Sequence, residues 1–129
     1  MNYYFKRILE NKTFDEAVEV IREALKAEGF GIVSDLDMRG TLKNKIDVDI
    51  RNYRILGACN PSFAYRSLQS EPAIGTLLPC NVVVQELGED RIEIDIIDPL
   101  VAMQVVENEA VKAIATEIHT KLEKVINAI

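Results

Sequence analysis

The sequence feature that most constrains the fold is residues 91–96, Arg-Ile-Glu-Ile-Asp-Ile, in which charged residues alternate with isoleucine. Because side chains of a β-strand point alternately to its two faces, this pattern predicts a strand with its isoleucines facing a core. Residues 77–87 precede it as an apolar segment, and Gly88-Glu89-Asp90 forms the turn between them. The two segments should therefore pair as an antiparallel hairpin. The valine run at 82–84 lacks alternation, which predicts a central strand covered on both faces or an interface.

Two amphipathic helices are predicted, one early and one late in the chain. Thr13-Phe14-Asp15-Glu16 fits a capping box, in which the Thr13 hydroxyl and the Glu16 carboxylate satisfy backbone amides at the start of a helix. Apolar residues then recur every three or four positions, and Gly29 ends the helix. Asn108 should cap a long terminal helix. Its apolar stripe is wide enough for a helix lying across a sheet and consists of Val111, Ile114, Ala115, Ile118, Leu122, Val125, Ile126 and Ile129.

Three further strands are expected at residues 3–9, 30–36 and 53–59, where β-branched and aromatic residues gather. In the second of these, Phe30, Ile32, Ser34 and Leu36 should share one face. Gly57 in the third marks a bulge or a close approach of another group to the backbone. Residues 47–52 are open to a loop or an irregular strand.

Two short helices are also predicted. One should be capped by Asp37 and run through residue 45, with Leu42 and Ile46 as apolar anchors. The other should have Asn60 as its N-cap and Pro61 as its first residue, since proline there loses an amide that has no partner in any case. Its inner face is expected to hold Ala64, Tyr65 and Leu68.

These elements predict a single α+β domain over residues 1–129, with an antiparallel sheet of about five strands packed on two main helices in two layers. The chain has 129 residues and is 48% hydrophobic, which is enough for one core without a disulfide or a metal. The sheet face away from the helices is expected to carry Tyr3, Phe5, Val83 and Ile97. An apolar sheet face without helices is a common place to dimerise or to bind a ligand.

Charge and cysteine content limit the partners and the compartment. The formal net charge of −6 excludes a general affinity for nucleic acid or an anionic membrane surface. The first residues form no signal-peptide core and no segment is long enough to cross a bilayer, so we expect a cytoplasmic protein. Its two cysteines are expected to be reduced thiols.

Two segments carry Cys-Asn pairs and resemble a known family. Gly57-Ala58-Cys59-Asn60-Pro61 and Pro79-Cys80-Asn81 are similar to motifs of a family of small prokaryotic domains of unknown function. The similarity runs almost end to end, through Asp98-Pro99 and the terminal helix. The resemblance implies a β-α-β4-α fold, with short helices inserted, of the kind found in the TATA-box-binding protein. It implies no activity, and it gives no reason to expect DNA binding.

The same two pairs are the candidate binding site, which comprises Cys59, Asn60, Pro61, Cys80 and Asn81. If the strands that carry them are neighbours, both pairs lie at one edge of the sheet. Cys59 would then adjoin a helix N-terminus, which favours a thiolate. A nucleophilic or redox thiol with Cys80 as its partner is one hypothesis, with Asn60 or Asn81 as oxyanion donors. The alternative is that both cysteines are small buried side chains and both asparagines are caps.

Other polar residues allow weaker hypotheses. His119 is the only histidine, and we expect it to be structural, since a zinc site with Cys59 and Cys80 would need a fourth ligand. Glu93 and Asp95 share a strand face, where paired carboxylates either do acid-base work or simply face water. Asp98 before proline is typical of a turn. No catalytic residue, metal site or cofactor is expected. The glycines lack phosphate-loop spacing, so no nucleotide site is predicted.

The sequence therefore favours a non-enzymatic domain that binds a small molecule or a protein partner and acts as a homodimer. Its site would lie at the Cys-Asn pairs or on the sheet face that lacks helices. The alternative is a thiol-dependent enzyme or a redox-responsive protein that uses Cys59 with Cys80.

Overall fold

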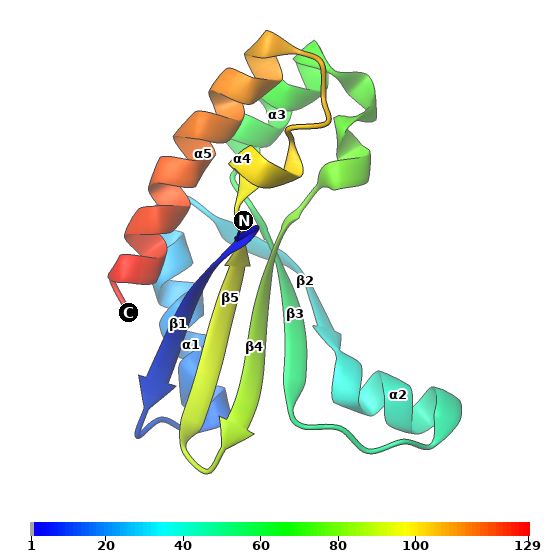
Figure 1. Ribbon diagram of the computed structural model, residues 1–129, viewed down its shortest axis with the longest axis vertical. Coiled ribbons are helices and arrows are strands. Elements are labelled where there is room, and N and C mark those ends of the chain that lie inside the picture. The colour runs from blue at the N-terminus through cyan, green and yellow to red at the C-terminus, as the bar shows by residue number, and fades with distance from the viewer. Residues whose placement is uncertain (1) are drawn as a thin grey trace.

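The computed structural model describes residues 2–129 and consists of a five-stranded antiparallel sheet with helices packed on it (Figure 1). The strand order is β1-β5-β4-β3-β2. The strands are β1 (Tyr4–Glu10), β2 (Gly31–Asp37), β3 (Tyr53–Cys59), β4 (Cys80–Gly88) and β5 (Arg91–Ile97). The helices are α1 (Phe14–Ala27), α2 (Met38–Ile46), α3 (Pro61–Ser70), the 3-10 helix η1 (Pro72–Leu77), α4 (Pro99–Ala102) and α5 (Glu109–Asn127). The predicted α+β two-layer class is confirmed.

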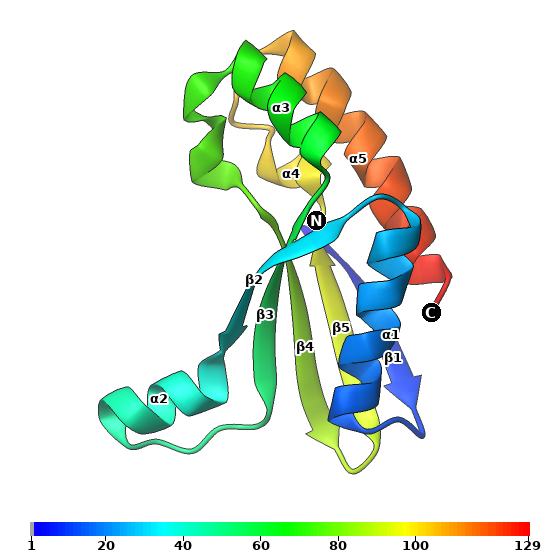
Figure 2. The same ribbon diagram turned by 180° about the vertical axis from the view of Figure 1, so that it is seen from behind.

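The hairpin predicted from the alternating residues is the centre of the fold. Strands β4 and β5 pair antiparallel, with Val82 opposite Ile96 and Val84 opposite Ile94. These four side chains are fully buried. They face α1 and α5, which cover one side of the sheet (Figure 2). Burial of such side chains contributes roughly 1.5–3 kcal/mol each, so this layer contributes strongly to the stability of the domain.

The helix that opens the α-layer begins as its sequence predicts. The backbone amide of Glu16 donates to the Thr13 hydroxyl at 3.1 Å, and the amide of Thr13 donates to the Glu16 carboxylate at 3.0 Å. The capping box is thus complete, and these bonds lower the pKa of Glu16. Gly29 follows the helix with φ of +86°, a conformation that glycine adopts without steric cost.

A second, smaller core lies beyond one end of the sheet. There α3, η1 and α4 pack with the first half of α5 (Figure 1). The buried residues of this cluster are Ile74, Met103, Val111 and Ala115. Helix α5 therefore contributes to both cores. Val111 and Ala115 near its start pack in the small core, and its later apolar residues pack in the large core. Within residues 2–129, no helix is both long and apolar enough to traverse a lipid bilayer.

Strand β2 departs from its predicted alternation. A bulge between Ile32 and Ser34 shifts its register against β3, so the expected shared face of alternate residues is wrong beyond that point. Val33 and Leu36 are exposed as a result. The physical cause lies opposite, where Ser34 pairs with Gly57 and its hydroxyl occupies the space that a side chain at Gly57 would need.

The two short helices also differ from their predicted faces. Helix α2 is capped by Asp37 as expected, but it projects from the sheet and Ile46 is exposed rather than an anchor (Figure 1). Helix α3 buries Phe63 and Ser67 instead of Tyr65 and Leu68, which are exposed. A small residue such as Ser67 lets α3 approach α5 closely, and this packing outweighs the apolar character of the other face.

Two further predictions, the start of β4 and the face of Phe5, are wrong. The segment predicted to start a strand at Leu77 forms η1 first, and β4 begins only at Cys80. Phe5 is not on the face without helices, because it pairs with the core residue Ile96 and its ring lies 5.1 Å from that of His119. Residues 47–52, whose sequence allows a loop or an irregular strand, form an irregular loop.

Candidate functional site

The sheet face opposite α1 carries a pocket of about 330 Å³, and among residues 2–129 no helix covers it (Figure 1). We call this side of the sheet the open face. Four of the five strands or their flanking residues supply the lining of the pocket. The lining residues are Tyr3, Tyr4, Tyr53, Asn81, Val83, Gln85, Glu93, Asp95 and Ile97. Of the residues expected on this face, Tyr3, Val83 and Ile97 lie there.

Strand alternation places the polar groups of the pocket side by side. Gln85 on β4 lies opposite Glu93 on β5, and Asp95 is two residues farther along the same face. The side-chain nitrogen of Gln85 donates to Glu93 Oε2 at 3.1 Å and to Asp95 Oδ2 at 2.8 Å. Arg51 donates to Gln85 Oε1 at 2.8 Å, which fixes the amide so that its nitrogen points at both carboxylates.

Asp95 is the most perturbed carboxyl group of the pocket. Burial raises its pKa to about 6, and the neighbouring Glu93 adds to the rise, while Gln85 and Lys6 act in the opposite direction. Its Oδ1 atom is buried and has no hydrogen-bond partner within residues 2–129. A buried, unpaired carboxylate oxygen is costly, which agrees with burial as the main cause of the raised pKa of Asp95.

Tyrosines form the walls around the carboxylates. The rings of Tyr3 and Tyr4 lie 4.9 Å apart at an angle of 58°. Burial raises the pKa of Tyr53, and the charge of Asp95 raises it further. Like any tyrosine, Tyr53 carries its phenolic proton at neutral pH and can donate a hydrogen bond. Three aromatic rings beside two carboxylates suit a ligand with a flat or cationic group.

The predicted Cys-Asn site is divided by the sheet. Ala58 lies opposite Cys80 and Gly57 opposite Asn81, so the strands that carry the two pairs are neighbours as expected. Cys80 points to the helix layer and belongs to the main core, whereas Asn81 is exposed on the open face and lines its pocket. The structure thus brings Cys59, Asn60 and Cys80 around one small cavity and leaves Asn81 outside it.

The cavity at the cysteines is small, and one of its thiols is unfavourable for chemistry. Its volume is about 20 Å³, close to the space that one water molecule needs. Burial raises the pKa of Cys80 to about 11, and the adjacent Cys59 contributes to the rise. Cys59 is half-buried, and Pro61 begins α3 beside it. Within the described chain, Asn60 makes no side-chain cap bond, and its amide packs against Gly29 instead.

A second cavity adjoins the pocket of the open face. It measures about 270 Å³ and shares Asn81 and Ile97 with that pocket. Its other walls come from η1, from the residues that lead into β4 and from α4, and they are mainly apolar. They are Thr76, Leu77, Leu78, Pro79, Cys80, Pro99, Ala102 and Met103. We call it the apolar cavity.

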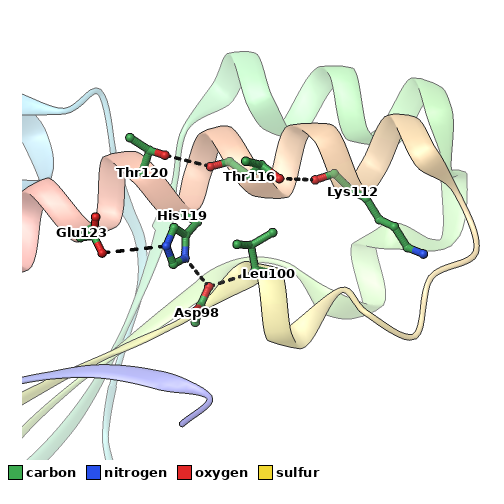
Figure 3. A network of polar contacts seen from close by, with 7 residues as sticks. All are labelled: Asp98, Leu100, Lys112, Thr116, His119, Thr120 and Glu123. Carbon is green, nitrogen blue, oxygen red and sulfur yellow. Dashed lines mark hydrogen bonds and ion pairs between the residues drawn. The ribbon is translucent and has the colours of Figure 1, made fainter. Parts of the chain in front are cut away.

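His119 forms part of a polar network between α4 and α5 (Figure 3). Its Nδ1 atom lies 2.8 Å from Asp98 Oδ1, and the same oxygen accepts the backbone amide of Leu100 at 3.0 Å. Its Nε2 atom lies 4.0 Å from Glu123 Oε2. The histidine joins the start of α4 to α5, which fits the expected structural role. No group of three or more metal-ligating side chains occurs among residues 2–129, so nothing there supports a zinc site.

The residues that sequence reasoning missed are Tyr4, Tyr53 and Gln85. Glu93 and Asp95 were recognised as sharing a face, but the burial of Asp95 was not expected. The signal was present in the alternation of the strands, since Gln85 is the polar residue that follows the valine run. This alternation identifies the pocket residues only when the uncovered face of the sheet and the order of its strands are known.

Comparisons with known proteins show a relationship over nearly the whole chain. A family model described as "Domain of unknown function DUF302" matches residues 5–129. A crystal structure of an uncharacterized conserved DUF302 protein from Bacillus stearothermophilus has a TM-score of 0.88 and 26% sequence identity to this chain. The alignment covers 98% of both chains. No curated protein matches the sequence.

Proposed function

The chain belongs to the DUF302 family, and from its own geometry we propose that it is a non-enzymatic domain that binds a small organic molecule on the open face of the sheet. The observation that carries the proposal is the pocket of about 330 Å³, which is lined by three tyrosines and by the carboxylate side chains of Glu93 and Asp95. This volume falls within the range typical of small-molecule sites. A donor or cationic group of a ligand that faces these carboxylates would offset part of the cost of their burial.

The supporting scaffold is rigid. The polar groups of the pocket project from β4 and β5, whose opposite sides are fully buried beneath the helices. Sites built on strands of a packed sheet hold their geometry better than sites on loops. Gln85 is itself fixed by Arg51, so the carboxylates are positioned before any ligand arrives.

The test is an NMR screen of the labelled protein with small molecules of different charge. We expect binders to perturb the side-chain amides of Asn81 and Gln85, because both residues line the pocket. The side-chain amide of Asn60 serves as an internal control, because it lies at the cysteine cavity. Perturbations confined to Asn60, or no binder from any class, would contradict the proposal.

The thiol hypothesis stays a prediction with less support. A thiol enzyme needs an accessible thiolate and room for a substrate. The cavity around Cys59 and Cys80 has a volume of only about 20 Å³, and the pKa of Cys80 is raised. The alkylation rates of both thiols in the native and the unfolded protein test this hypothesis. A native Cys59 that reacts faster than in the unfolded chain would favour it over the binding function.

We also propose that the protein is a cytoplasmic homodimer that uses the projecting α2 and the adjoining strand β2. Val33 and Ile46 are each 64% exposed, and Leu36 and Val48 are exposed as well. Exposed apolar side chains that gather on one face are typical of interaction surfaces, and these four belong to β2, α2 and the loop after α2. Light scattering of the purified protein tests the dimer, with Ile46→Lys expected to yield a monomer. A monomeric parent protein would exclude it.

The β-α-β4-α order of the main elements supports a relationship to the fold of the TATA-box-binding protein, which we propose at the level of architecture only. The net charge of −6 and the carboxylates on the open face oppose DNA binding by that surface.

A further inference from the structure

The pocket of the open face and the apolar cavity form two adjoining compartments of different chemistry. Glu93 and Asp95 line the first and not the second. The second is lined by leucine, proline, alanine and methionine side chains, and Met103 is nearly fully buried. Asn81 and Ile97 belong to both. A molecule that fills both compartments would therefore need one polar end and one apolar end.

The polar compartment has more negative charge than its neighbours neutralise. Among residues 2–129, no lysine or arginine nitrogen lies within 4.0 Å of a carboxylate oxygen of Glu93 or Asp95. Gln85 donates to one oxygen of each, and Asp95 Oδ1 has no partner at all in that part of the chain. A carboxylate pair held by a single neutral donor is a favourable environment for a cation.

The basic groups nearby do not fill this role. Lys6 on β1 lies opposite Asp95 in the strand register and lowers its pKa without forming an ion pair. Arg51 bonds the oxygen of Gln85 rather than a carboxylate. Tyr53 on β3 is uncharged at neutral pH like any tyrosine, and burial moves its pKa further up. The tyrosine rings instead offer π-faces, which attract organic ammonium groups.

We propose that the open face binds an amphipathic organic cation, whose ammonium group lies between Glu93 and Asp95 and whose apolar part enters the apolar cavity past Asn81 and Ile97. This inference rests on the proposed binding function and specifies the class of its ligand. The ammonium faces the negative charge of Glu93 and Asp95, which no lysine or arginine pairs among residues 2–129, and the methylenes displace water from the leucine and methionine surface. A free amine or guanidinium with a short hydrocarbon group has this chemistry.

The experiment is an NMR titration of the full chain with four probes that separate charge from chain length. Hexylammonium carries both features, hexanol only the chain, methylammonium only the charge, and hexanoate the chain with the opposite charge. At pH 7.5 we expect hexylammonium to bind at least about tenfold more tightly than each of the other three, since each feature contributes more than about 1.4 kcal/mol. The perturbed signals should include Asn81 and Gln85, which line the site.

Two variants locate the compartments. Asp95→Asn keeps the shape of the side chain and should reduce the affinity for hexylammonium about tenfold while leaving hexanol unchanged. Glu89→Gln removes the same charge from the exposed β4–β5 turn and is the matched control, with affinity expected within about twofold. Ala102→Leu places a larger side chain in the apolar cavity and should remove the advantage of hexylammonium over methylammonium.

The outcomes separate this inference from the function on which it rests. Equal affinity for hexanol and hexylammonium would overturn the cationic ligand and leave a small-molecule site on the open face. Equal affinity for methylammonium and hexylammonium would overturn the role of the apolar cavity. Tighter binding of hexanoate would reverse the assigned charge. If no probe perturbs Asn81 or Gln85, the inference and the proposed function both fail for this face.

Discussion

The two faces of the β4–β5 hairpin show how one pair of strands serves two purposes. On the helix side, Val82, Val84, Ile94 and Ile96 have no exposed surface. On the open face, the same strands carry Val83, Gln85, Glu93 and Asp95, which are half-buried around the pocket. Successive residues of a strand point in opposite directions, so each core residue has a site residue as its neighbour.

This difference teaches that stability and binding are separable in sequence although they share a backbone. Substitutions on the helix side should change the free energy of unfolding, and substitutions on the open face should change the affinity for the ligand. Residues at the edge of the pocket contact other elements of the fold. Substitutions there should change both stability and binding. Four predictions test it.

The largest expected effect comes from two neighbouring valines. Val84→Ala should lower the free energy of unfolding by about 2–3 kcal/mol, because it opens a cavity in a fully buried layer. Val83→Ala makes the same change on the open face and should cost less than about 1 kcal/mol. Urea denaturation of both variants measures the difference. Similar losses would show that the open face is packed as tightly as the core.

The second effect concerns the part of the open face that is already filled. A Cβ atom at Gly57 would lie 2.2 Å from the Ser34 hydroxyl and 2.6 Å from Pro79 Cγ. Gly57→Ala should therefore cost about 2 kcal/mol through forced displacement of its neighbours.

Gly31→Ala is the matched control for this change, since nothing lies within 4 Å of a Cβ atom there. It should alter the free energy of unfolding by less than about 0.5 kcal/mol. A neutral Gly57→Ala would mean that β2 and the segment before β4 move apart easily at this point.

The third effect is a pH dependence that belongs to the open face. The pKa of Asp95 rises from 3.8 to about 6 in the folded protein, so folding favours its protonated form. The stabilisation that protonation supplies is present below about pH 3.8 and is lost as the pH rises through 6. Asp95→Asn avoids this loss and should be more stable than the parent by about 1 kcal/mol at pH 7.5. This difference is smaller than the full pKa shift implies, because solvent in the pocket screens the charge of Asp95.

Denaturation at pH 7.5 and at pH 3.5 checks the sign, because the advantage of Asp95→Asn should vanish at the lower pH. The side chains that face the Asp95 carboxyl group are unchanged in this comparison. They are Lys6 on β1, Gln85 on β4, Glu93 on β5 and Tyr53 on β3. A variant that is less stable than the parent at pH 7.5 would mean that the ionised Asp95 is well solvated.

The smallest effect is that of Asp98→Asn, at the residue where the alternation of β5 ends. Asp98 caps α4 through Leu100 and contacts His119 with the same oxygen. Asp98→Asn keeps an acceptor for the cap and loses only the charge toward the histidine, so it should cost about 0.5 kcal/mol. Asp98→Ala removes both contacts and should cost about 1–2 kcal/mol. Equal losses in thermal or urea denaturation would show that the histidine contact dominates.

Much of the fold could be predicted because its signals are local. The capping box at Thr13, the alternation of residues 91–96 and the stripe of the terminal helix each predicted an element that the structure contains. Gly57 was expected to mark a bulge or a close approach, and both are found at its pairing with Ser34.

The wrong predictions concern residues whose burial depends on a partner far away in the sequence. The inner face of α3 depends on α5, which lies some fifty residues away, as the bond from Arg66 to Glu117 illustrates. Phe5 was placed on the wrong side because three aromatic residues in a row, Tyr3-Tyr4-Phe5, give no alternation to read. The candidate site at the Cys-Asn pairs rests on local motifs and stays untested, whereas the pocket on the open face depends on which strands are neighbours. That information is not contained in any one segment.

The strand order has a further consequence for the way the chain folds. Strands β2, β3, β4 and β5 follow one another along the chain and pair in that order, so each contact forms between neighbours in sequence. Strand β1 must instead join β5 across 81 residues, as the bond between Arg91 and Glu10 shows. Closing so long a loop is slow, and we expect this edge to assemble last and to exchange its amide hydrogens first. Tyr3 and Tyr4 stand at the start of this strand, so the pocket would be complete only when folding itself is complete.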